Sequence, residues 1–303
     1  MNLSPHGRFI RKGLTGRPAA SAALGAPDRP EARPAMVRRE AFPPVPPPKL
    51  RKLSAPFLDL VEHGRNVTGT EAGSFEVGAR RYAIPRFSFC GPEGSVPKKR
   101  IGLFALIHGD EPAGAYALLR LLRTLVDHPV LAAGYDVACY PVCNPTGYED
   151  DTRPNRAGID LNREFWRGSG QPEVRILERE LSTRDFDGII ALHADDTSDG
   201  LYGYAHGRVI DEGLLVPALR ASERVLPRNR GPVIDGFTAP DGIIRDCFAG
   251  VLAPPPDRKP RPFEIIFETP AAARLEQQVK AATVALETIL TAYRGFIAYA
   301  ANL

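Results

Sequence analysis

Apolar residues along the chain follow two periodicities, one typical of strands and the other of helices. Residues 101–107 form a continuous apolar run, as in a strand that is buried on both faces. Residues 112–126 follow with leucines at helical spacing. The same patterns predict further strands at 74–77, 81–89, 135–142, 188–192 and 264–267, and further helices at 56–67, 173–181, 214–225 and 271–293. Strands that alternate with helices predict an α/β fold, a single domain whose mostly parallel or mixed central sheet carries helices on both faces.

The first 52 residues have a different character from the rest. They contain 11 Lys or Arg against 3 Asp or Glu, and residues 1–50 hold 10 of the 30 prolines. Large apolar residues are sparse there, so the segment cannot bury enough surface to offset the entropy lost on ordering. We therefore predict that residues 1–52 are a disordered Pro/Arg-rich arm and that residues 53–303 are the folded domain.

The net charge of +3 changes meaning once the arm is set apart. Residues 53–303 contain 28 Lys or Arg and 33 Asp or Glu, a net charge of −5, so we expect no nucleic-acid partner. No apolar run approaches the roughly 18 residues of a membrane span, so we expect no membrane partner either. The N-terminus has no continuous apolar stretch typical of a secretory signal, and none of the four cysteines forms a CxxC pair. We expect a cytoplasmic protein with buried free thiols.

Two candidate metal ligands stand directly after the predicted strand 101–107. His108 and Glu111 are three residues apart, a spacing that lets both side chains face one point. An imidazole and a carboxylate suit zinc, and a catalytic zinc takes three protein ligands and keeps one open position. The same pair is also compatible with a helix-capping histidine and a first-turn glutamate favoured by the helix dipole.

A third ligand is available at a second strand end. His193 follows the predicted strand 188–192, and sites of parallel sheets lie at the carboxyl ends of strands. A histidine after a buried strand is often an ordinary core residue, but two strand ends that offer suitable ligands favour a metal site. His206 is the competitor, although it lies in a glycine-rich stretch with no apolar strand ending at it.

Five short strings then occur in a fixed order along residues 101–270. They are HGDE at 108–111, NPTG at 144–147, DLNR at 160–163, LH at 192–193 and FETP at 267–270. Residues 144–163, taken alone, read as a long solvated loop rich in polar side chains. Together the strings resemble the M14 metallocarboxypeptidase superfamily, which includes the bacterial murein peptide amidases and the aspartoacylase and succinylglutamate desuccinylase branch. The resemblance does not cover the N-terminal arm.

The resemblance implies a zinc carboxypeptidase-like fold with one Zn²⁺ per chain. His108, Glu111 and His193 match the three zinc ligands. Asp160 matches the carboxylate that orients the first zinc histidine, a contact that fixes the tautomer of the ligand. Glu268 matches the general base. A buried glutamate at a strand end is costly to charge without a function, which also favours this role.

The resemblance further implies which residues bind the substrate. Asn162 and Arg163 match the pair that holds the terminal carboxylate of the substrate, a task that suits the fork of a guanidinium group. Arg153 matches the arginine that stabilises the oxyanion, and Arg156 is the rival for this role.

Two features depart from the digestive members of the superfamily or are less firmly aligned. No tyrosine occurs between Tyr204 and Tyr293, so the tyrosine that closes over the substrate is expected to be missing. Residues 243–246 align roughly with the specificity region, where Arg245 would favour an acidic side chain if it faced the pocket. The alternative is that Arg245 pairs with Asp246 or another surface acid.

Residues 53–303 are therefore expected to be a zinc peptidase catalytic domain that cleaves a peptide or amide bond next to a free carboxylate, as a metallocarboxypeptidase or murein peptide amidase does. The chain ends 35 residues after Glu268, too soon for the extra C-terminal β-domain of the aspartoacylase branch. An N-acyl amino acid amidohydrolase acting on a small amide is the first alternative. A peptide-binding pseudo-peptidase without metal is the second, and the intact set of ligands and Glu268 argues against it.

Overall fold

The computed structural model describes residues 47–303, except 95–96, 207–209 and 301–303. Most of the predicted arm, up to residue 46, lies outside the described residues. The described chain is built around one mixed sheet of eight strands, as predicted. Their spatial order is β1 (Val67–Val77), β2 (Arg80–Cys90), β4 (Tyr135–Tyr140), β3 (Lys99–Ala105), β5 (Gly188–Asp195), β10 (Phe263–Pro270), β6 (Tyr202–Ala205) and β9 (Ile243–Ile244).

The middle of the sheet is parallel and its outer pairs are mixed. Strands β4, β3, β5 and β10 run in the same direction. Antiparallel pairs join β1 to β2, β2 to β4 and β10 to β6, while β9 runs parallel to β6. A separate hairpin of β7 (Val233–Ile234) and β8 (Phe237–Thr238) follows β6 along the chain. The parallel strands therefore end at one common edge, where the sequence places its candidate ligands.

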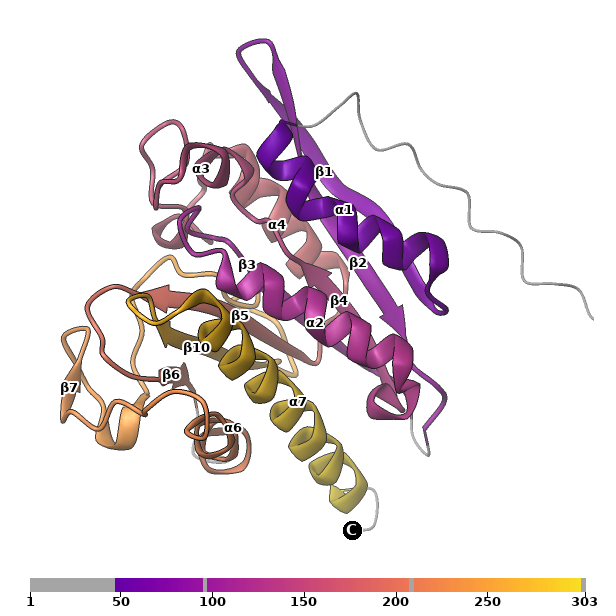
Figure 1. Ribbon diagram of the computed structural model, residues 1–303. Helices are drawn as coiled ribbons and strands as arrows, with labels where there is room; N and C mark the ends of the chain where they lie inside the picture. Colours follow the sequence, from indigo (N-terminus) through magenta and orange to yellow (C-terminus); the bar gives the residue numbers. More distant parts are fainter. Residues whose placement is uncertain (1–46, 95–96, 207–209, 301–303) are drawn as a thin grey trace, which may run out of the picture. The chain divides into compact units, whose positions relative to one another are not determined.

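Helices cover both faces of the sheet (Figure 1). Adjacent residues of a strand point to opposite faces, so Leu103 packs in the apolar cluster of one face and Phe104 in the cluster of the other. The first cluster includes residues of α2 (Ala113–Asp127), α6 (Val216–Ser222) and α7 (Leu275–Ala300), and the second includes residues of α4 (Pro172–Thr183). The predicted arrangement of helices on both faces is confirmed.

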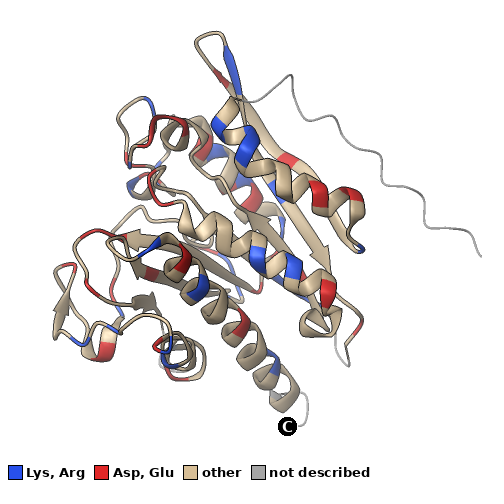
Figure 2. Cartoon of the chain, in the orientation of Figure 1, with Lys and Arg blue, Asp and Glu red and all other residues tan. Residues whose placement is uncertain are grey.

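Charged residues of both signs occur along the outer helices. Figure 2 shows Lys and Arg together with Asp and Glu along α2 and α7. No helix of the described residues combines the length and the apolar character needed to cross a membrane. All four cysteines are free, but only Cys139 and Cys143 are buried as predicted, whereas Cys90 is exposed and Cys247 is partly buried.

Several element bounds differ from the prediction. The predicted helix 271–293 begins at Leu275 and continues to Ala300, and the predicted strand 74–77 is the end of the longer β1. A π-helical turn, Asp211–Leu215, precedes α6. The short helix α3 (Pro145–Asp150) and the short strands β6 and β9 were not predicted, because elements of a few residues leave no periodicity to detect.

The first helix corrects the boundary of the predicted arm. Helix α1 (Pro48–His63) includes residues 48–52, which the proline content had assigned to a disordered segment. Proline is well tolerated in the first turn of a helix, where its missing N–H needs no partner. Leu50, Leu53 and Phe57 lie on one face of α1 and are buried, so this face holds the helix against the domain.

Replacing Phe57 tests whether α1 belongs to the cooperative fold. Its side chain is fully buried and its ring stacks on Phe87 with 4.8 Å between centroids. We expect Phe57→Ala to lower the free energy of unfolding by about 3–5 kcal/mol, through lost burial and the cavity left behind. Urea unfolding measures the change. Val130→Ala, at a side chain that is 67% exposed, is the control and should change stability by less than about 0.5 kcal/mol. Equal stability of wild type and Phe57→Ala would show that α1 does not contribute to the fold.

Candidate metal centre and active site

The candidate ligands lie at the carboxyl edge of the parallel strands. His108 lies just beyond the end of β3. Between them, Leu106 is buried and has a φ of 52°, in the left-handed region. This conformation is uncommon for a leucine, and burial of its side chain offsets the strain. His193 lies near the end of β5 and is paired in register with Glu268 of β10. Segments far apart in the sequence thus meet at one point.

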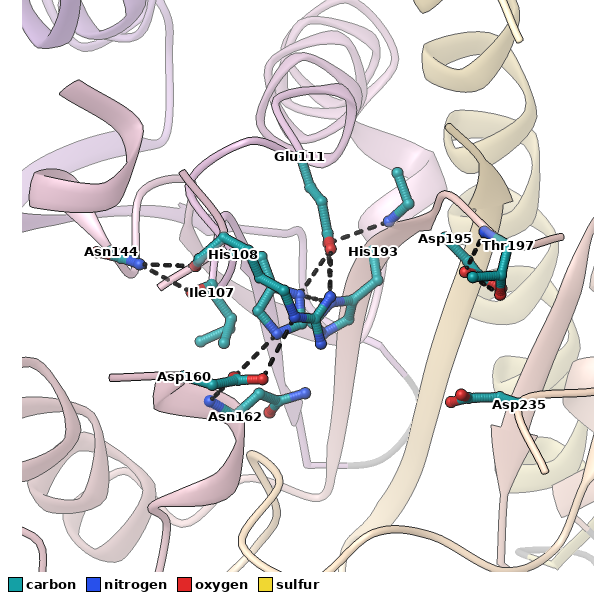
Figure 3. A network of polar contacts seen from close by, with 12 residues as sticks. Ile107, His108, Glu111, Asn144, Asp160, Asn162, His193, Asp195, Thr197 and Asp235 are labelled. Atoms are coloured by element: carbon teal, nitrogen blue, oxygen red, sulfur yellow. Dashed lines mark hydrogen bonds and ion pairs between the residues drawn. The ribbon is translucent and has the colours of Figure 1, made fainter. Parts of the chain in front are cut away.

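His108, Glu111 and His193 form one compact, buried group (Figure 3). The Nδ1 atoms of the two histidines are 3.2 Å apart. The carboxylate oxygens of Glu111 lie 2.6 Å from Nδ1 of His108 and 3.0 Å from Nδ1 of His193. Ligand atoms at about 2.0–2.1 Å around a tetrahedral zinc are about 3.3 Å from one another. The group therefore has the donor types and the spacing of a metal site.

Electrostatics agree with this assignment. Burial works to raise the pKa of Glu111, but the electrostatic interactions and hydrogen bonds with His108 and His193 outweigh it and hold the pKa below its usual range. The backbone N–H of Ala194 also donates to Glu111, over 3.1 Å. Glu111 is thus kept ionised inside the protein, as a carboxylate ligand must be.

Asp160 lies behind His108, on the side away from Glu111. Its carboxylate is 3.2 Å from Nε2 of His108 and accepts a hydrogen bond of 2.9 Å from the backbone N–H of Asn162. An ionised carboxylate only accepts, so Nε2 of His108 carries the proton and Nδ1 offers its lone pair to the metal site. The placement agrees with the role that the sequence resemblance implies for Asp160.

The structure separates the two candidate arginines. Arg153 lies beside the metal group, with Nη1 3.5 Å from Glu111 and Nε 3.3 Å from Asp160. Arg156 instead binds the carboxylates at the end of α3, with Nη2 2.5 Å from Asp150. Arg153 is therefore the arginine that lies at the site.

A buried amide fixes the segment that carries Arg153. The side chain of Asn144 donates to the carbonyl oxygens of Ile107, over 3.2 Å, and of Arg153, over 3.4 Å. It thereby ties the end of β3 to the arginine loop. The two segments approach so closely that a Cβ atom on Gly109 would lie 2.0 Å from the carbonyl carbon of Gly147. These contacts give a physical reason for the asparagine and glycines in the HGDE and NPTG strings.

A cavity of about 260 Å³ joins the metal group to the other candidate residues. Asn162 and Arg163 line it, and the Arg163 guanidinium lies 4.2 Å from the centroid of the Phe248 ring. A larger groove of about 540 Å³, near Arg100 and Phe186, contains none of these groups. The smaller cavity is therefore the candidate active site, because it contains the metal group.

Glu268 is the remaining candidate and also lines the cavity. Its side chain is buried at the end of β10, next to His193 across the strand pair. Burial, together with the carboxylates of Glu111 and Asp195, raises the pKa of Glu268 well above its usual value, and Arg153 opposes this effect. These surroundings therefore favour the protonated form of this carboxyl group more than water would.

Comparison with known proteins shows which fold the chain has. No family model and no curated protein matches the chain. It is similar in structure to a candidate metallopeptidase from Shewanella baltica OS155, with a TM-score of 0.67 and 23% identity over 80% of this chain and 91% of that one. It is also similar to a metallo-carboxypeptidase from Burkholderia cenocepacia (TM-score 0.63, 17% identity, 80% and 68% covered) and to carboxypeptidase A from Helicoverpa armigera (TM-score 0.55, 19% identity, 81% and 70% covered). The chain has the metallocarboxypeptidase fold.

Within this metallocarboxypeptidase fold, the cavity is also lined by two tyrosines that the sequence analysis did not predict as site residues. Tyr202 and Tyr204 belong to β6, which runs antiparallel to β10 and pairs Tyr202 with Glu268. The sequence analysis predicted that no tyrosine closes the site because none occurs between Tyr204 and Tyr293. That stretch does not include Tyr202 or Tyr204. Their spacing of two residues, which puts both on one face of a strand, was the available signal.

The structure places two other residues away from the metal group. Arg245 follows the buried residues of β9, is exposed, and is not among the described residues that line the cavity. Of the two predicted alternatives for Arg245, its exposed position agrees with the one in which it does not reach the pocket. His206, the competitor for the third ligand, has its Nε2 atom 3.5 Å from Sγ of Cys247 and does not belong to the metal group.

Proposed function

We propose that the protein is a zinc-dependent hydrolase that cleaves a peptide or amide bond next to a free carboxylate. One observation carries the proposal. A buried His–Glu–His group shares a single cavity with Glu268, Arg153 and Arg163. The cavity thus contains groups suited to each task of amide hydrolysis: metal binding, proton transfer, oxyanion binding and carboxylate binding.

Two imidazoles and one carboxylate are a ligand set of catalytic zinc, with a fourth position left for water or substrate. When bound, zinc polarises the scissile carbonyl group and lowers the pKa of water towards about 7. His108, Glu111 and His193 would hold it. The hydrogen bond from His108 to Asp160 would keep the first imidazole in the tautomer that binds metal.

Glu268 supplies the proton transfer in this proposal. As a carboxylate it accepts the proton of the attacking water, and it then donates this proton to the nitrogen of the leaving amine. Its buried surroundings favour the protonated form between these two steps. Arg153 stabilises the oxyanion, because its guanidinium group is held beside Glu111 by contact with Asp160.

Asn162 and Arg163 complete the site by binding the carboxylate of the substrate. The guanidinium group of Arg163 is oriented by a 2.8 Å hydrogen bond to the carbonyl oxygen of Asn162 and by the ring of Phe248. The Asn162 side-chain oxygen accepts from the backbone N–H of Leu252, so its NH₂ group is left as a donor. Both residues thus offer donors to an anion.

The second candidate function is hydrolysis of N-acyl amino acids. It is favoured by the modest size of the cavity, about 260 Å³. Both functions need the same carboxylate and the same chemistry. They differ in the acyl part, so activity on an N-acetyl amino acid, relative to an N-acylated dipeptide, separates them.

The carboxylate requirement is the test of the proposed function. We expect an N-acylated dipeptide with a free C-terminus to be hydrolysed, and its C-terminal amide to be a poor substrate. Arg163→Ala should lower kcat/KM for the free peptide by about 10- to 100-fold, the usual scale for a lost charge-assisted hydrogen bond. Arg167→Ala, an exposed arginine four residues further on, is the matched control and should have little effect. Equal hydrolysis of the amide would rule out a carboxypeptidase, and binding without hydrolysis would indicate a peptide-binding protein.

A further inference from the structure

A thiol, an imidazole and a carboxylate meet on three neighbouring strands, apart from the metal group. Strand β6 lies between β10 and β9 in the sheet. Glu264 belongs to β10, His206 directly follows β6, and Cys247 lies shortly after β9. Ile265 pairs with Ala205 in antiparallel register, so Glu264 and His206, the next residue on each strand, lie side by side.

These three side chains influence one another. The Sγ atom of Cys247 is 3.5 Å from Nε2 of His206, within hydrogen-bonding distance for sulfur. Burial raises the pKa of Glu264, while the charge of His206 and a hydrogen bond of 3.3 Å from Arg261 oppose the rise. Cys247, His206 and Glu264 thus form a Cys–His–Glu group, in which a nucleophile contacts a base and the base lies beside a carboxylate.

The thiol of this group faces the candidate active site. Cys247 is partly buried and lines the cavity that contains the metal group. The next residue, Phe248, lines the same cavity, and its ring contacts the guanidinium group of Arg163. A group attached to Sγ of Cys247 would therefore share the cavity with the substrate, close to the arginine proposed to bind its carboxylate.

The other cysteines have different surroundings. Cys139 and Cys143 are fully buried, and burial raises the pKa of both thiols, so they are inert. Cys90 is exposed, and its Sγ atom lies 3.1 Å from Nζ of Lys98. It lines the groove near Arg100 rather than the cavity with the metal group. Cys247 is thus the cysteine from which a modification can reach the active site.

We propose that Cys247 is a modification site, at which exchange with a low-molecular-weight disulfide forms a mixed disulfide that closes the cavity to substrate. His206 takes the proton of the thiol, and the thiolate attacks one sulfur of the disulfide. A new S–S bond forms as the old one breaks, and the departing thiolate receives the proton from His206. No further oxidant is needed, and a second thiol reverses the exchange. The effect on hydrolysis rests on the proposed function, whereas formation of the mixed disulfide does not.

The base is needed because the thiol does not ionise readily by itself. Burial, together with the charges of Glu264 and Asp246, raises the pKa of Cys247, and Arg261 opposes this effect. The thiolate is the form that reacts, so the exchange depends on a group that accepts the proton. His206 is in contact with the thiol and can accept it.

Treatment with a neutral disulfide tests the site. The zinc-loaded full chain is treated with 2-hydroxyethyl disulfide, and mass spectrometry of the intact chain and of its peptides identifies the modified cysteine. We expect an adduct on Cys247 and an at least about 10-fold loss of activity on an N-acylated dipeptide, because the attached group occupies the concave site. Zinc content should stay the same, and a phosphine reductant should restore activity. A fully active Cys247 adduct would overturn the proposal.

Two serine variants assign the effect to one thiol. Cys247→Ser should carry the adduct on Cys90 and keep its activity during treatment, relative to its own untreated sample. Cys90→Ser is the matched control, because it removes the other reachable thiol, and it should lose activity as the wild type does. Loss of activity in treated Cys247→Ser, or adducts confined to Cys90 in the wild type, would contradict the assignment.

The rate of exchange tests the part assigned to His206. His206→Ala should slow adduct formation on Cys247 by at least about 10-fold, the lower end of what a lost general base costs. Cys90 in the same chain is the internal reference and should react at its wild-type rate. An unchanged rate on Cys247 would show that the thiol does not depend on this imidazole.

Mass and activity together separate this proposal from the proposed function. If the untreated protein hydrolyses no peptide but Cys247 forms the adduct and the adduct weakens peptide binding in calorimetry, the modification site is supported and the hydrolase is not. If the untreated protein hydrolyses the peptide and Cys247 does not react, the hydrolase stands and the modification site is refuted.

Discussion

The variant His193→Ala is expected to lose its bound metal and, with it, all measurable hydrolysis. Only two protein ligands, His108 and Glu111, would remain, and catalytic zinc sites use three. Glu111 would also lose a partner that keeps it ionised, which weakens the site further. Metal content after dialysis against zinc-free buffer, measured by elemental analysis, tests this. We expect about one zinc per wild-type chain and little in the variant.

His206→Ala is the matched control for this experiment. His206 was the alternative third ligand, but it contacts Cys247 and does not belong to the metal group. The control should therefore retain zinc and activity. Full zinc retention in His193→Ala, or loss of zinc in His206→Ala, would show that the third ligand is wrongly assigned.

The second large effect is expected on turnover without loss of metal. Glu268→Gln keeps the shape of the side chain but can no longer accept the proton of the attacking water. We expect kcat to fall by roughly two orders of magnitude or more, the scale of a lost general base, with zinc content and KM little changed. Steady-state kinetics on a peptide with a free C-terminus, together with metal analysis, measures both quantities.

Glu264→Gln provides the comparison on the same strand. Glu264 is also buried in β10, but it lies four residues before Glu268 and does not line the cavity. This variant should retain turnover. Near-normal turnover in Glu268→Gln would remove Glu268 from the mechanism, and a loss of zinc would mean that it supports the metal site instead.

The sequence by itself predicted the architecture and the candidate ligands of the metal group. A strand covered by helices on both faces must be apolar at every position, so β3 and β5 appear as continuous apolar runs. The carboxyl ends of such strands meet at one edge, and this rule placed His108 and His193 near each other before any distance was known. The spacing made Glu111 a candidate, because residues three apart at the start of a helix can face one point, and the resemblance to the metallocarboxypeptidases assigned it as a ligand.

Only the tertiary structure decided the rest of the site. Arg153 and Arg156 are both arginines of one loop, and the contacts to Asp160 and Asp150 distinguish them. Helix α1 could not be predicted from composition, since its stability comes from the burial of one face rather than from its proline-rich start.

The tyrosines and aspartates that line the cavity depend most on the fold. Strand β6 has four residues, and nothing in its sequence indicates that it pairs with β10 and brings Tyr202 beside Glu268. Asp195 and Asp235 reach the same cavity from separate segments, one from a strand end and one from a hairpin turn. Sequence patterns indicate the local geometry and burial of one segment. The side chains that face a substrate come from several segments, and the order of strands in the sheet decides which of these segments meet. For this reason the metal group could be predicted from the strand ends, whereas the tyrosines and aspartates that line the cavity could be placed only once the strands were in place.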